Sequence, residues 1–364
     1  MAATAAGLLA RRGERLTCFT SVPRPGFDAA LYPARYVTVE REGAAAVAAA
    51  YGNVDHQLID SAGYRLMATM RRWVDAMGEP VLNAVNVLWI TAIFDRAREL
   101  GVKVMLQGSM GNATISWTSQ NVLSEYLRTG RLMELARTAW TLRRNGGTSF
   151  RDAAAGALHG LAPHWLTRRV AHPVRQADAT RTALHPLLVA KYAAKLSPDY
   201  FRGDAKAQRM QFFRMADDAS VRQTVAALWG IDVRDPTDDR RVWEFCCGIP
   251  PEQFVVGGHT RSLVRRAMLG RVPDAVRLNY RLGLQGADWW VPVGEDLPAM
   301  REELALQEKS PAANAVVDLA KLKRLLESWP AGGYEQRETT QSWNYALTRG
   351  LTMGYFLRSW EERA

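Results

Sequence analysis

The first hundred residues alternate between helix-like and strand-like segments, and this alternation most constrains the fold. "AATAAGLLARRG" predicts a helix that ends at Gly13, and "RLTCFTSV" predicts a strand rich in β-branched and aromatic residues. "REGAAAVAAAYG" and "DHQLI" repeat the same order of helix and strand. Strands that alternate with helices imply right-handed crossovers, so we expect an α/β fold with a doubly wound parallel sheet.

A longer helical segment precedes the most apolar strand. In "NAVNVLWITAIFDRAREL" apolar residues recur at helical spacing. The following "GVKVMLQG" is a continuous apolar run, which is typical of a strand buried on both faces of a parallel sheet. Such sheets bind ligands at the carboxyl ends of their strands. Residues 107–112 are therefore expected at the ligand edge.

The pattern becomes mostly helical after about residue 120. The helical pattern is interrupted at "RRNGGTSF", "APHW" and "LSPDYFRGD". We predict an α/β nucleotide-binding part over residues 1–120. Residues 121–364 are expected to form a helical lobe that packs over the carboxyl edge of the sheet.

Composition excludes several classes of protein. Apolar residues at 48% and charged residues at 23% are typical of a folded globular chain. The net charge of +10 comes mostly from scattered arginines without a nucleic-acid-binding motif, so no nucleic-acid partner is predicted. The chain has no apolar run long enough to predict a membrane span. Its three cysteines suggest neither a disulfide framework nor a zinc site, which fits a cytoplasmic protein.

Three stretches carry more specific information. The first, "VMLQGSMGNATISW", is a strand followed by a glycine-bounded turn without a charged residue. The second, "WGIDVRDPTDDRRVWEF", contains the pattern acid-x-Arg-x-Pro-x-x-Asp, and the third, "GGHTRSLVRRAMLGRVPDAVRLNYRLGLQGADWW", contains a basic-x-Gly turn at Arg281. In this order they resemble the synthetase domain of the asparagine synthetase family, which includes β-lactam synthetases and lasso-peptide cyclases.

The resemblance implies a fold of the adenine-nucleotide α-hydrolase (ATP pyrophosphatase) type, with ATP and Mg²⁺ as cofactors. Enzymes of this family adenylate a carboxylate, which an amine then attacks. The cofactor-binding residues implied here are Gln107, Gly108 and Gly111 of the turn, together with Ser21 at the end of the first strand.

The same resemblance assigns three further positions. Ser109 stands where the family has its catalytic glutamate, and Asn112 stands at the Mg²⁺-binding aspartate. Arg281 replaces a lysine that neutralises the transition state, and it keeps the positive charge. Asn112 offers a neutral oxygen to the metal, so weaker Mg²⁺ binding is expected. The alternatives are that Asn112 caps a turn and that Arg281 is a solvent-facing cation.

The family's Ser-Gly-Gly-Leu-Asp-Ser loop would lie just before Met1, and these 364 residues contain no such motif. The glutamine-hydrolysing domain of asparagine synthetases would also lie upstream. We therefore expect either a start codon further upstream or a degenerate domain. Arg234 and Asp239 are expected to form a structural pair that fastens the lobe to the sheet.

The expected function is that of an ATP- and Mg²⁺-dependent amide-forming ligase. "GNATISW" and "RLNYRLGLQ" resemble versions of these motifs in the lasso-cyclase-like branch. The expected substrate is a small acid or a peptide, with a precursor peptide as a possible partner. The alternative is a catalytically silent homologue that binds a peptide or another subunit.

Overall fold

The computed structural model describes residues 1–119, 122–144, 157, 182–192, 206–207, 209–210, 213 and 218–363. Its strands are β1 (Leu16–Ser21), β2 (Tyr36–Val37), β3 (Val54–Ile59), β4 (Val104–Leu106), β5 (Asp232–Arg234), β6 (Val255–Val256), β7 (His259–Thr260) and β8 (Leu282–Gly283). Short helical turns occur at η1 (Ala29–Leu31), η2 (Ser109–Asn112), η3 (Pro236–Asp238) and η4 (Pro251–Phe254), and a π-helix at η5 (Thr340–Leu347).

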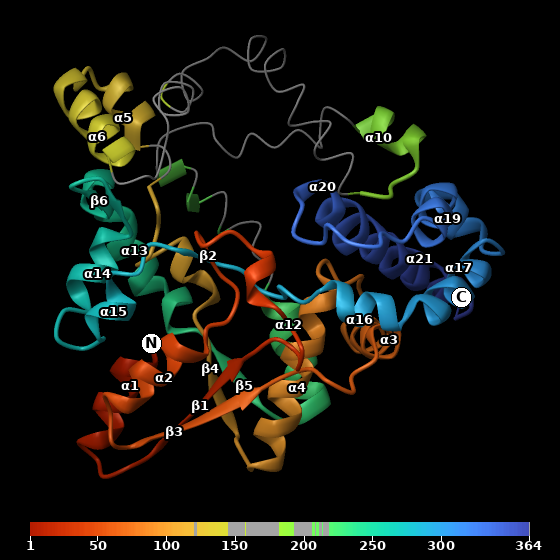
Figure 1. Cartoon of the computed structure of the whole chain (residues 1–364), viewed down its shortest axis with the longest axis horizontal. Helices are drawn as coiled ribbons and strands as arrows, with labels where there is room; N and C mark the ends of the chain where they lie inside the picture. The colour runs from red at the N-terminus through yellow and green to blue at the C-terminus, as the bar shows by residue number, and fades with distance from the viewer. Residues whose placement is uncertain are drawn as a thin grey trace.

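Helices make up most of the described structure (Figure 1). Those before residue 145 are α1 (Ala2–Ala10), α2 (Arg41–Ala49), α3 (Leu66–Met77), α4 (Ala84–Glu99), α5 (Val122–Arg128) and α6 (Leu132–Arg144). Those after it are α10 (Pro186–Tyr192), α12 (Asp218–Trp229), α13 (Arg240–Gly248), α14 (Ser262–Ala267), α15 (Asp274–Arg277), α16 (Trp290–Glu295), α17 (Leu297–Gln307), α18 (Pro311–Val316), α19 (Leu319–Glu327), α20 (Arg337–Thr339) and α21 (Thr348–Glu361).

Parallel strand pairs confirm the α/β class. β1 pairs with β3 in register from Leu16 opposite Val54 to Ser21 opposite Ile59, and α2 connects the two strands. β4 pairs with β5 from Val104 opposite Asp232 to Leu106 opposite Arg234. β2 and β8 form a third parallel pair, and β6 and β7 form an antiparallel one. Within the described residues these pairs are separate two-stranded sheets, so the expected doubly wound sheet is not confirmed.

The two faces of the β1–β3 pair carry different helices. Phe19 packs against the main hydrophobic core, to which α4 contributes. Helix α1 also contacts β1, and Met1, Ala2 and Cys18 line the same cavity. Successive side chains of a strand point to opposite faces. Helices α1 and α4 therefore cover opposite faces of this pair.

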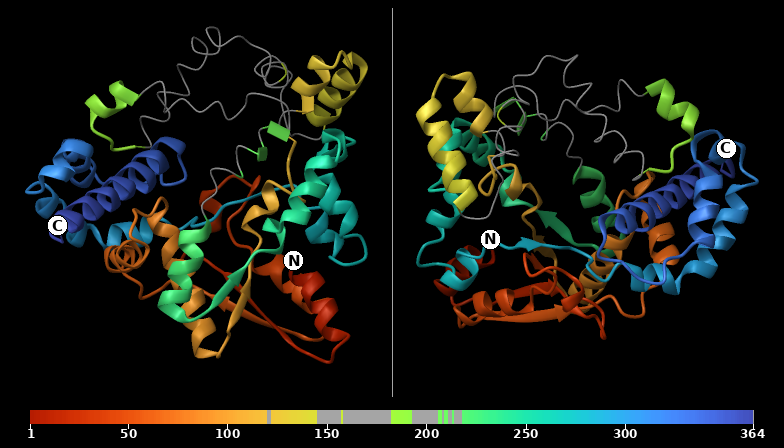
Figure 2. Two further views of the ribbon diagram at one scale, coloured as in Figure 1. Left: turned by 180° about the vertical axis from the view of Figure 1, so that it is seen from behind. Right: turned by 45° about the horizontal axis from the view of Figure 1, so that its top comes forward.

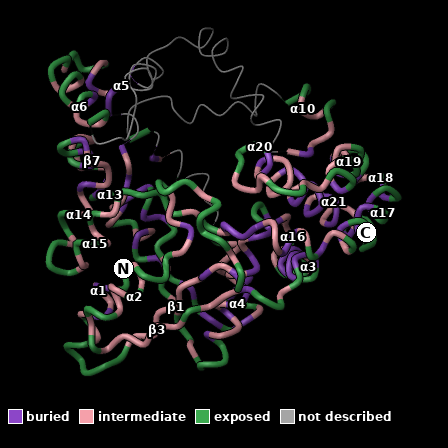
Figure 3. The backbone as a smooth tube through the Cα atoms, in the orientation of Figure 1, coloured by how far each residue is buried: buried purple, intermediate pink, exposed green. Residues whose placement is uncertain are grey.

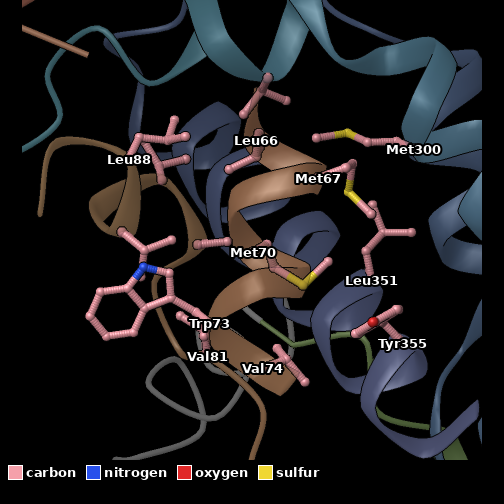
Figure 4. Packing of buried hydrophobic residues seen from close by; sticks show 14 of the residues in the cluster. Leu66, Met67, Met70, Trp73, Val74, Val81, Leu88, Met300, Leu351 and Tyr355 are labelled. Carbon is pink, nitrogen blue, oxygen red and sulfur yellow. The ribbon is translucent and has the colours of Figure 1, made fainter. Parts of the chain in front are cut away.

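One hydrophobic core joins the α/β part to the C-terminal helices. Leu66, Met70 and Trp73 of α3 are almost fully buried in the same cluster as Leu322 of α19 and Leu351 of α21. Figure 4 shows Leu66 and Met70 of α3 beside Leu351 of α21 in this core. The cluster draws on residues from both sides of position 120, so the division there stays a prediction.

The burial pattern places this core away from α5 and α6. Buried residues gather around α3, α4 and the C-terminal helices (Figure 3). Both views in Figure 2 place α5 and α6 at the opposite end of the molecule from α17, α19 and α21. A smaller apolar cluster, which includes Val122, Tyr126 and Val255, holds the α5–α6 hairpin against the β6–β7 hairpin.

The strand "GVKVMLQG" differs from its prediction. β4 was expected to be buried on both faces, yet Val104 is 48% exposed and Leu106 is 45% exposed. The physical reason is that β4 pairs with β5 on one side while its other side borders a cavity. No helix in the described part of the chain combines the length and the apolar character needed to cross a bilayer.

Candidate functional site

A cavity of about 1000 Å³ lies between the β1–β3 pair and the β4–β5 pair. Residues 16–20 of β1 form one wall, and residues 104–108, from β4 and the start of the following turn, form another. Helices α1 and α2 contribute small side chains such as Ala5 and Ala48, whereas α4 and α12 contribute larger ones such as Ile93 and Val225. Ligand pockets of this size with largely apolar walls are typical of sites for small molecules and cofactors.

The turn that follows β4 forms the rim of this cavity. The Gln107 N–H donates to the Arg234 carbonyl at 3.0 Å, which ends the ladder between β4 and β5. Gly108 precedes η2, and Gln107, Gly108, Ser109 and Asn112 all line the cavity. The structure thus brings together four of the residues that the sequence assigns to the site.

Asp235, directly after β5, fixes the conformation of this turn. One carboxylate oxygen accepts from the Ser109 hydroxyl at 2.8 Å and from the Met110 N–H at 3.0 Å. The other accepts from the Thr237 N–H at 2.7 Å and from the Thr237 hydroxyl at 2.5 Å. Asp235 therefore ties η2 to η3, two segments more than a hundred residues apart in the sequence.

The hydrogen bonds to Asp235 favour its charged form. Burial alone would raise the pKa of this carboxyl, but the donors from Thr237, Met110 and Ser109 outweigh it and lower the pKa below its ordinary value. Asp235 is thus an ionised anchor. It occupies an unspecified position of the motif acid-x-Arg-x-Pro-x-x-Asp, and sequence reasoning missed it.

Ser109 and Gly111 are already engaged within the turn. The Ser109 hydroxyl points to Asp235, so it positions η2 in this structure. Gly111 is buried, and its N–H donates to the Gly108 carbonyl at 3.1 Å. The amides of Met110, Ala113 and Thr114 also donate within the protein. A backbone cradle for an anion at Gly111 would require these bonds to open.

Asn112 is exposed on the rim, and its side-chain oxygen accepts from the Ser116 hydroxyl at 3.5 Å. Among the described residues no group of three or more His, Cys, Asp or Glu side chains is placed to hold a metal. The carboxylate of Asp235, which is bound to the turn, has both oxygens occupied by protein donors. The side chains present at the turn do not make a Mg²⁺ site by themselves.

Ser21 lies in a second, smaller cavity of about 210 Å³ beside the first. It is lined by the end of β1 and by residues 284–288 of the segment after β8. Gln285 lines both cavities, as do Thr20 and Trp89. Ser21 and the turn at Gln107 therefore face two adjoining cavities, and Gln285 is a further site residue that motif spacing did not single out.

Arg281 does not line either of these two cavities. It is exposed just before β8, and its N–H donates to the Asn279 side chain at 3.0 Å. Arg265 supports this segment by donating to the Arg277 carbonyl and, at 3.0 Å, to the Asn279 carbonyl. Its guanidinium also lies 4.2 Å from the centre of the Tyr280 ring. The structure does not bring Arg281 together with Ser109.

The expected pairing of Arg234 with Asp239 is wrong. Arg234 pairs with Asp232 at 2.7 Å on the exposed surface of β5. Asp239 pairs with Arg241, which holds the pKa of the Asp239 carboxyl at about 2. Each partner lies two residues away in the sequence, so both pairs are local contacts. The link between η2 and η3 comes from Asp235 instead.

The amino end of the chain also reaches the large cavity. A side chain on Gly108 would approach the Met1 side chain to 2.8 Å, so Met1 lies against the turn. Burial lowers the pKa of the Met1 amine and raises the pKa of the Cys18 thiol, and both residues line the cavity. These two groups were not expected at the site.

The geometry defines a class of protein with a cavity between parallel strands, and the turn at the cavity's rim follows the carboxyl end of β4, the kind of position where α/β proteins bind nucleotides and other small ligands. The sequence profile described as asparagine synthase matches residues 4–358. The chain therefore belongs to the asparagine synthase family, and this membership indicates ATP-dependent amidoligase activity in general terms. Comparisons with curated proteins and with solved structures found no significant match.

Proposed function

We propose that this protein is an ATP- and Mg²⁺-dependent ligase that adenylates a carboxylate and joins it to an amine. The observation that carries the proposal is the cavity between β1 and β4, whose rim is formed by the turn from Gln107 to Asn112 after the carboxyl end of β4. Family membership over residues 4–358 supports the same reaction class.

The strand arrangement is compatible with a doubly wound sheet that is interrupted at its centre. The proposed order is β3, β1, the cavity, β4 and β5. In this order β3 follows β1 in the sequence and lies on the side of β1 away from the cavity, and β5 follows β4 and lies on the side of β4 away from the cavity. In such an order the direction of strand addition reverses at the cavity. This reversal is where doubly wound sheets bind nucleotides.

The residues that line the cavity suit part of an ATP molecule. The apolar side chains of α4 and α12 suit a nucleoside, and the Gln107 and Asn112 side chains at the rim offer amide groups to polar atoms. They do not supply charged ligands for Mg²⁺, so no step is assigned to the metal here. When bound, ATP supplies the leaving group that activates a carboxylate.

This chain's own residues would orient the reactants. Asp235 keeps the turn rigid, Gln107 presents its amide to the cavity, and Gln285 connects the two cavities. Arg281 would have to approach the rim from its exposed position in order to stabilise negative charge. The amine then displaces AMP from the acyl-adenylate, which forms the amide bond.

The substrate proposed is the side-chain carboxylate of a peptide or a small acid, as in the lasso-cyclase-related branch. The support is the resemblance of "GNATISW" and "RLNYRLGLQ" to motifs of that branch. Both segments border the described cavities through Asn112 and Gln285. A precursor peptide would be the corresponding partner.

The test is to incubate the protein with ATP, Mg²⁺, candidate acids and amines, and to measure AMP and pyrophosphate. A second preparation carries the Ser-Gly-Gly-Leu-Asp-Ser loop and a preceding strand ahead of Met1. Formation of AMP and pyrophosphate that depends on the acid supports the proposal. Its absence from both preparations, with ATP binding also absent, contradicts it.

The second candidate is a silent homologue that binds a peptide or a subunit. The observation that favours it is the bond from Ser109 to Asp235, because the hydroxyl at the family's catalytic position is committed to the fold. Binding of ATP without turnover in both preparations would select this candidate.

A further inference from the structure

The smaller cavity, of about 210 Å³, lies at the carboxyl ends of two parallel strand pairs. Ser21 ends β1, and Ser61 follows the end of β3 by two residues. Thr38 comes directly after β2, and Leu284 comes directly after its partner strand β8. The carboxyl ends of parallel strands are where α/β proteins place ligand-binding groups. The smaller cavity therefore has the position of a ligand site in its own right.

The charged residues of the two cavities have opposite signs. Glu40 and Asp288 line the smaller cavity, and no Arg, Lys or His is among the described residues that line it. Arg15 lines the large cavity, whose described lining contains no Asp or Glu. A cavity lined by one sign of charge attracts ligands of the opposite sign. This contrast favours an anion such as a nucleotide in the large cavity and a cation in the smaller one.

Asp288 is a buried carboxylate without a cationic partner. The residue is 8% exposed, and one of its carboxylate oxygens accepts from the Arg24 N–H at 2.8 Å. The Arg24 guanidinium is engaged elsewhere, because it donates to Glu295 at 2.6 Å and to the Ser61 hydroxyl at 3.2 Å. Within the described part of the chain, Asp288 forms no ion pair, and its second carboxylate oxygen has no donor. A buried carboxylate that no cation balances is costly, and a bound cation would reduce that cost.

Both acids are held by the loops that follow β2 and β8. The Tyr32 hydroxyl donates to the Ala287 carbonyl at 2.9 Å, which fixes the backbone beside Asp288. A Cβ on Gly283 would lie 2.9 Å from a carboxylate oxygen of Glu40, so this carboxylate lies against β8. Because β2 and β8 pair in parallel, the two loops approach the smaller cavity from neighbouring strands.

The two cavities also share part of their walls. Thr20, Trp89 and Gln285 line both, so a ligand in the smaller cavity would lie beside a ligand in the large one. Amide formation requires the amine to be held next to the activated carboxylate. Trp89 adds an indole ring, which attracts a cation more strongly than the other aromatic side chains do. The smaller cavity thus combines negative charge, an aromatic ring and contact with the proposed nucleotide site.

We propose that the smaller cavity binds the amine substrate of the ligase as a primary alkyl ammonium ion, with Asp288 as its main ion-pair partner and Glu40 as a second. The inference rests on the ligase reaction proposed above and names the class of its second substrate. Primary amines are protonated at neutral pH, so the two carboxylates meet the form that predominates in solution. A lysine side chain or the amino end of a peptide carries such a group.

The probe is n-butylammonium, added to the full chain at pH 7 in low-salt buffer without ATP. Titration followed by saturation-transfer difference NMR measures its dissociation constant. We expect saturable binding of n-butylammonium and at least tenfold weaker binding of 1-butanol and of butyrate, which lack the positive charge. No saturable binding of n-butylammonium, or equal binding of 1-butanol, would overturn the proposal.

Three variants test the location of the site. Asp288→Asn keeps the size of the side chain and an acceptor for the Arg24 N–H, and it should weaken n-butylammonium binding at least tenfold. Glu40→Gln, at an exposed position, should weaken binding about threefold. Glu42→Gln removes the same charge two residues away, outside both cavities, and should leave binding unchanged. Equal losses in all three variants would show an effect of net charge and overturn the proposal.

The pair Glu40→Gln and Glu42→Gln decides the question if Asp288→Asn does not fold, and equal affinities of that pair would then overturn the proposal. Adenosine tests the other ligand of the reaction. The ligase proposal places the nucleoside in the large cavity, so adenosine should not displace n-butylammonium. Displacement by adenosine would assign the smaller cavity to the nucleoside and overturn the inference.

Failure of the ligase proposal gives a different result from failure of the amine site. Absence of AMP and pyrophosphate, together with n-butylammonium binding that depends on Asp288, would contradict the ligase and leave the cation site in place. Amide formation with the same KM for n-butylammonium in the wild type and in Asp288→Asn would support the ligase and overturn the amine site.

Discussion

The carboxylate of Asp235 accepts hydrogen bonds from both η2 and η3, and the residue is only 7% exposed. Hydrogen bonds to a charged group contribute more to stability than neutral ones. Asp235→Asn removes the charge and should lower the free energy of unfolding by about 2 kcal/mol. Urea unfolding measures this change. Asp232→Asn, at an exposed ion pair, is the matched control and should change stability by less than about 1 kcal/mol. Equal effects of the two variants would contradict the anchoring role.

Acid should weaken the same anchor. The folded state lowers the pKa of Asp235, so its contribution to stability is fully present above the ordinary pKa of an aspartate, about 3.9. That contribution is lost as the pH falls from there through the lowered value. The free energy of unfolding of the wild type should therefore fall more steeply below pH 4 than that of Asp235→Asn. Parallel pH profiles of the two proteins would show that Asp235 is not responsible.

Asn112 tests the proposed metal position. If Mg²⁺ binds with ATP at the rim, Asn112→Asp adds a charged oxygen ligand and should tighten Mg²⁺ binding in the presence of ATP by about tenfold. Isothermal titration calorimetry of Mg²⁺ into the protein in the presence of ATP measures the Mg²⁺ affinity. Asn112→Leu has a similar size without an oxygen ligand and should weaken binding. If neither variant changes the Mg²⁺ affinity, Asn112 is not a ligand.

At the scale of elements, the sequence predicted most of the α/β part. The segments "RLTCFTSV", "DHQLI" and "NAVNVLWITAIFDRAREL" correspond to β1, β3 and α4, because their periodicity is a local property that neighbours in space do not alter. The prediction that β4 is buried on both faces was wrong, because burial depends on which strands lie beside it. Asp235 was missed for a similar reason. Its partners Ser109 and Met110 lie 126 and 125 residues away, and no local pattern reports such a contact.

The contact between α6 and the β6–β7 hairpin depends on a glycine. Gly258 has a φ of +75°, and a Cβ there would lie 2.4 Å from the Thr141 carbonyl carbon. Gly258→Ala should therefore combine backbone strain, about 1 kcal/mol, with a steric clash. Gly270→Ala is the control, because Gly270 has a φ of +71° with no atom within 4 Å. Chemical unfolding should show a larger loss for Gly258→Ala. Equal losses would mean that the clash is relieved by movement of α6.

For the whole molecule, the shared core decides whether residues 1–120 fold independently. Leu88 of α4 and Leu351 of α21 are each 1% exposed within the same cluster. Leu88→Ala and Leu351→Ala should each reduce stability by about 2–5 kcal/mol. Because both side chains belong to one core, each variant should shift a single unfolding transition of the whole chain. Near-ultraviolet circular dichroism and the hydrogen exchange of β1 and α19 amides should report this transition at the same denaturant concentration. Two transitions, with Leu351→Ala shifting only that of the C-terminal helices, would restore the division at residue 120.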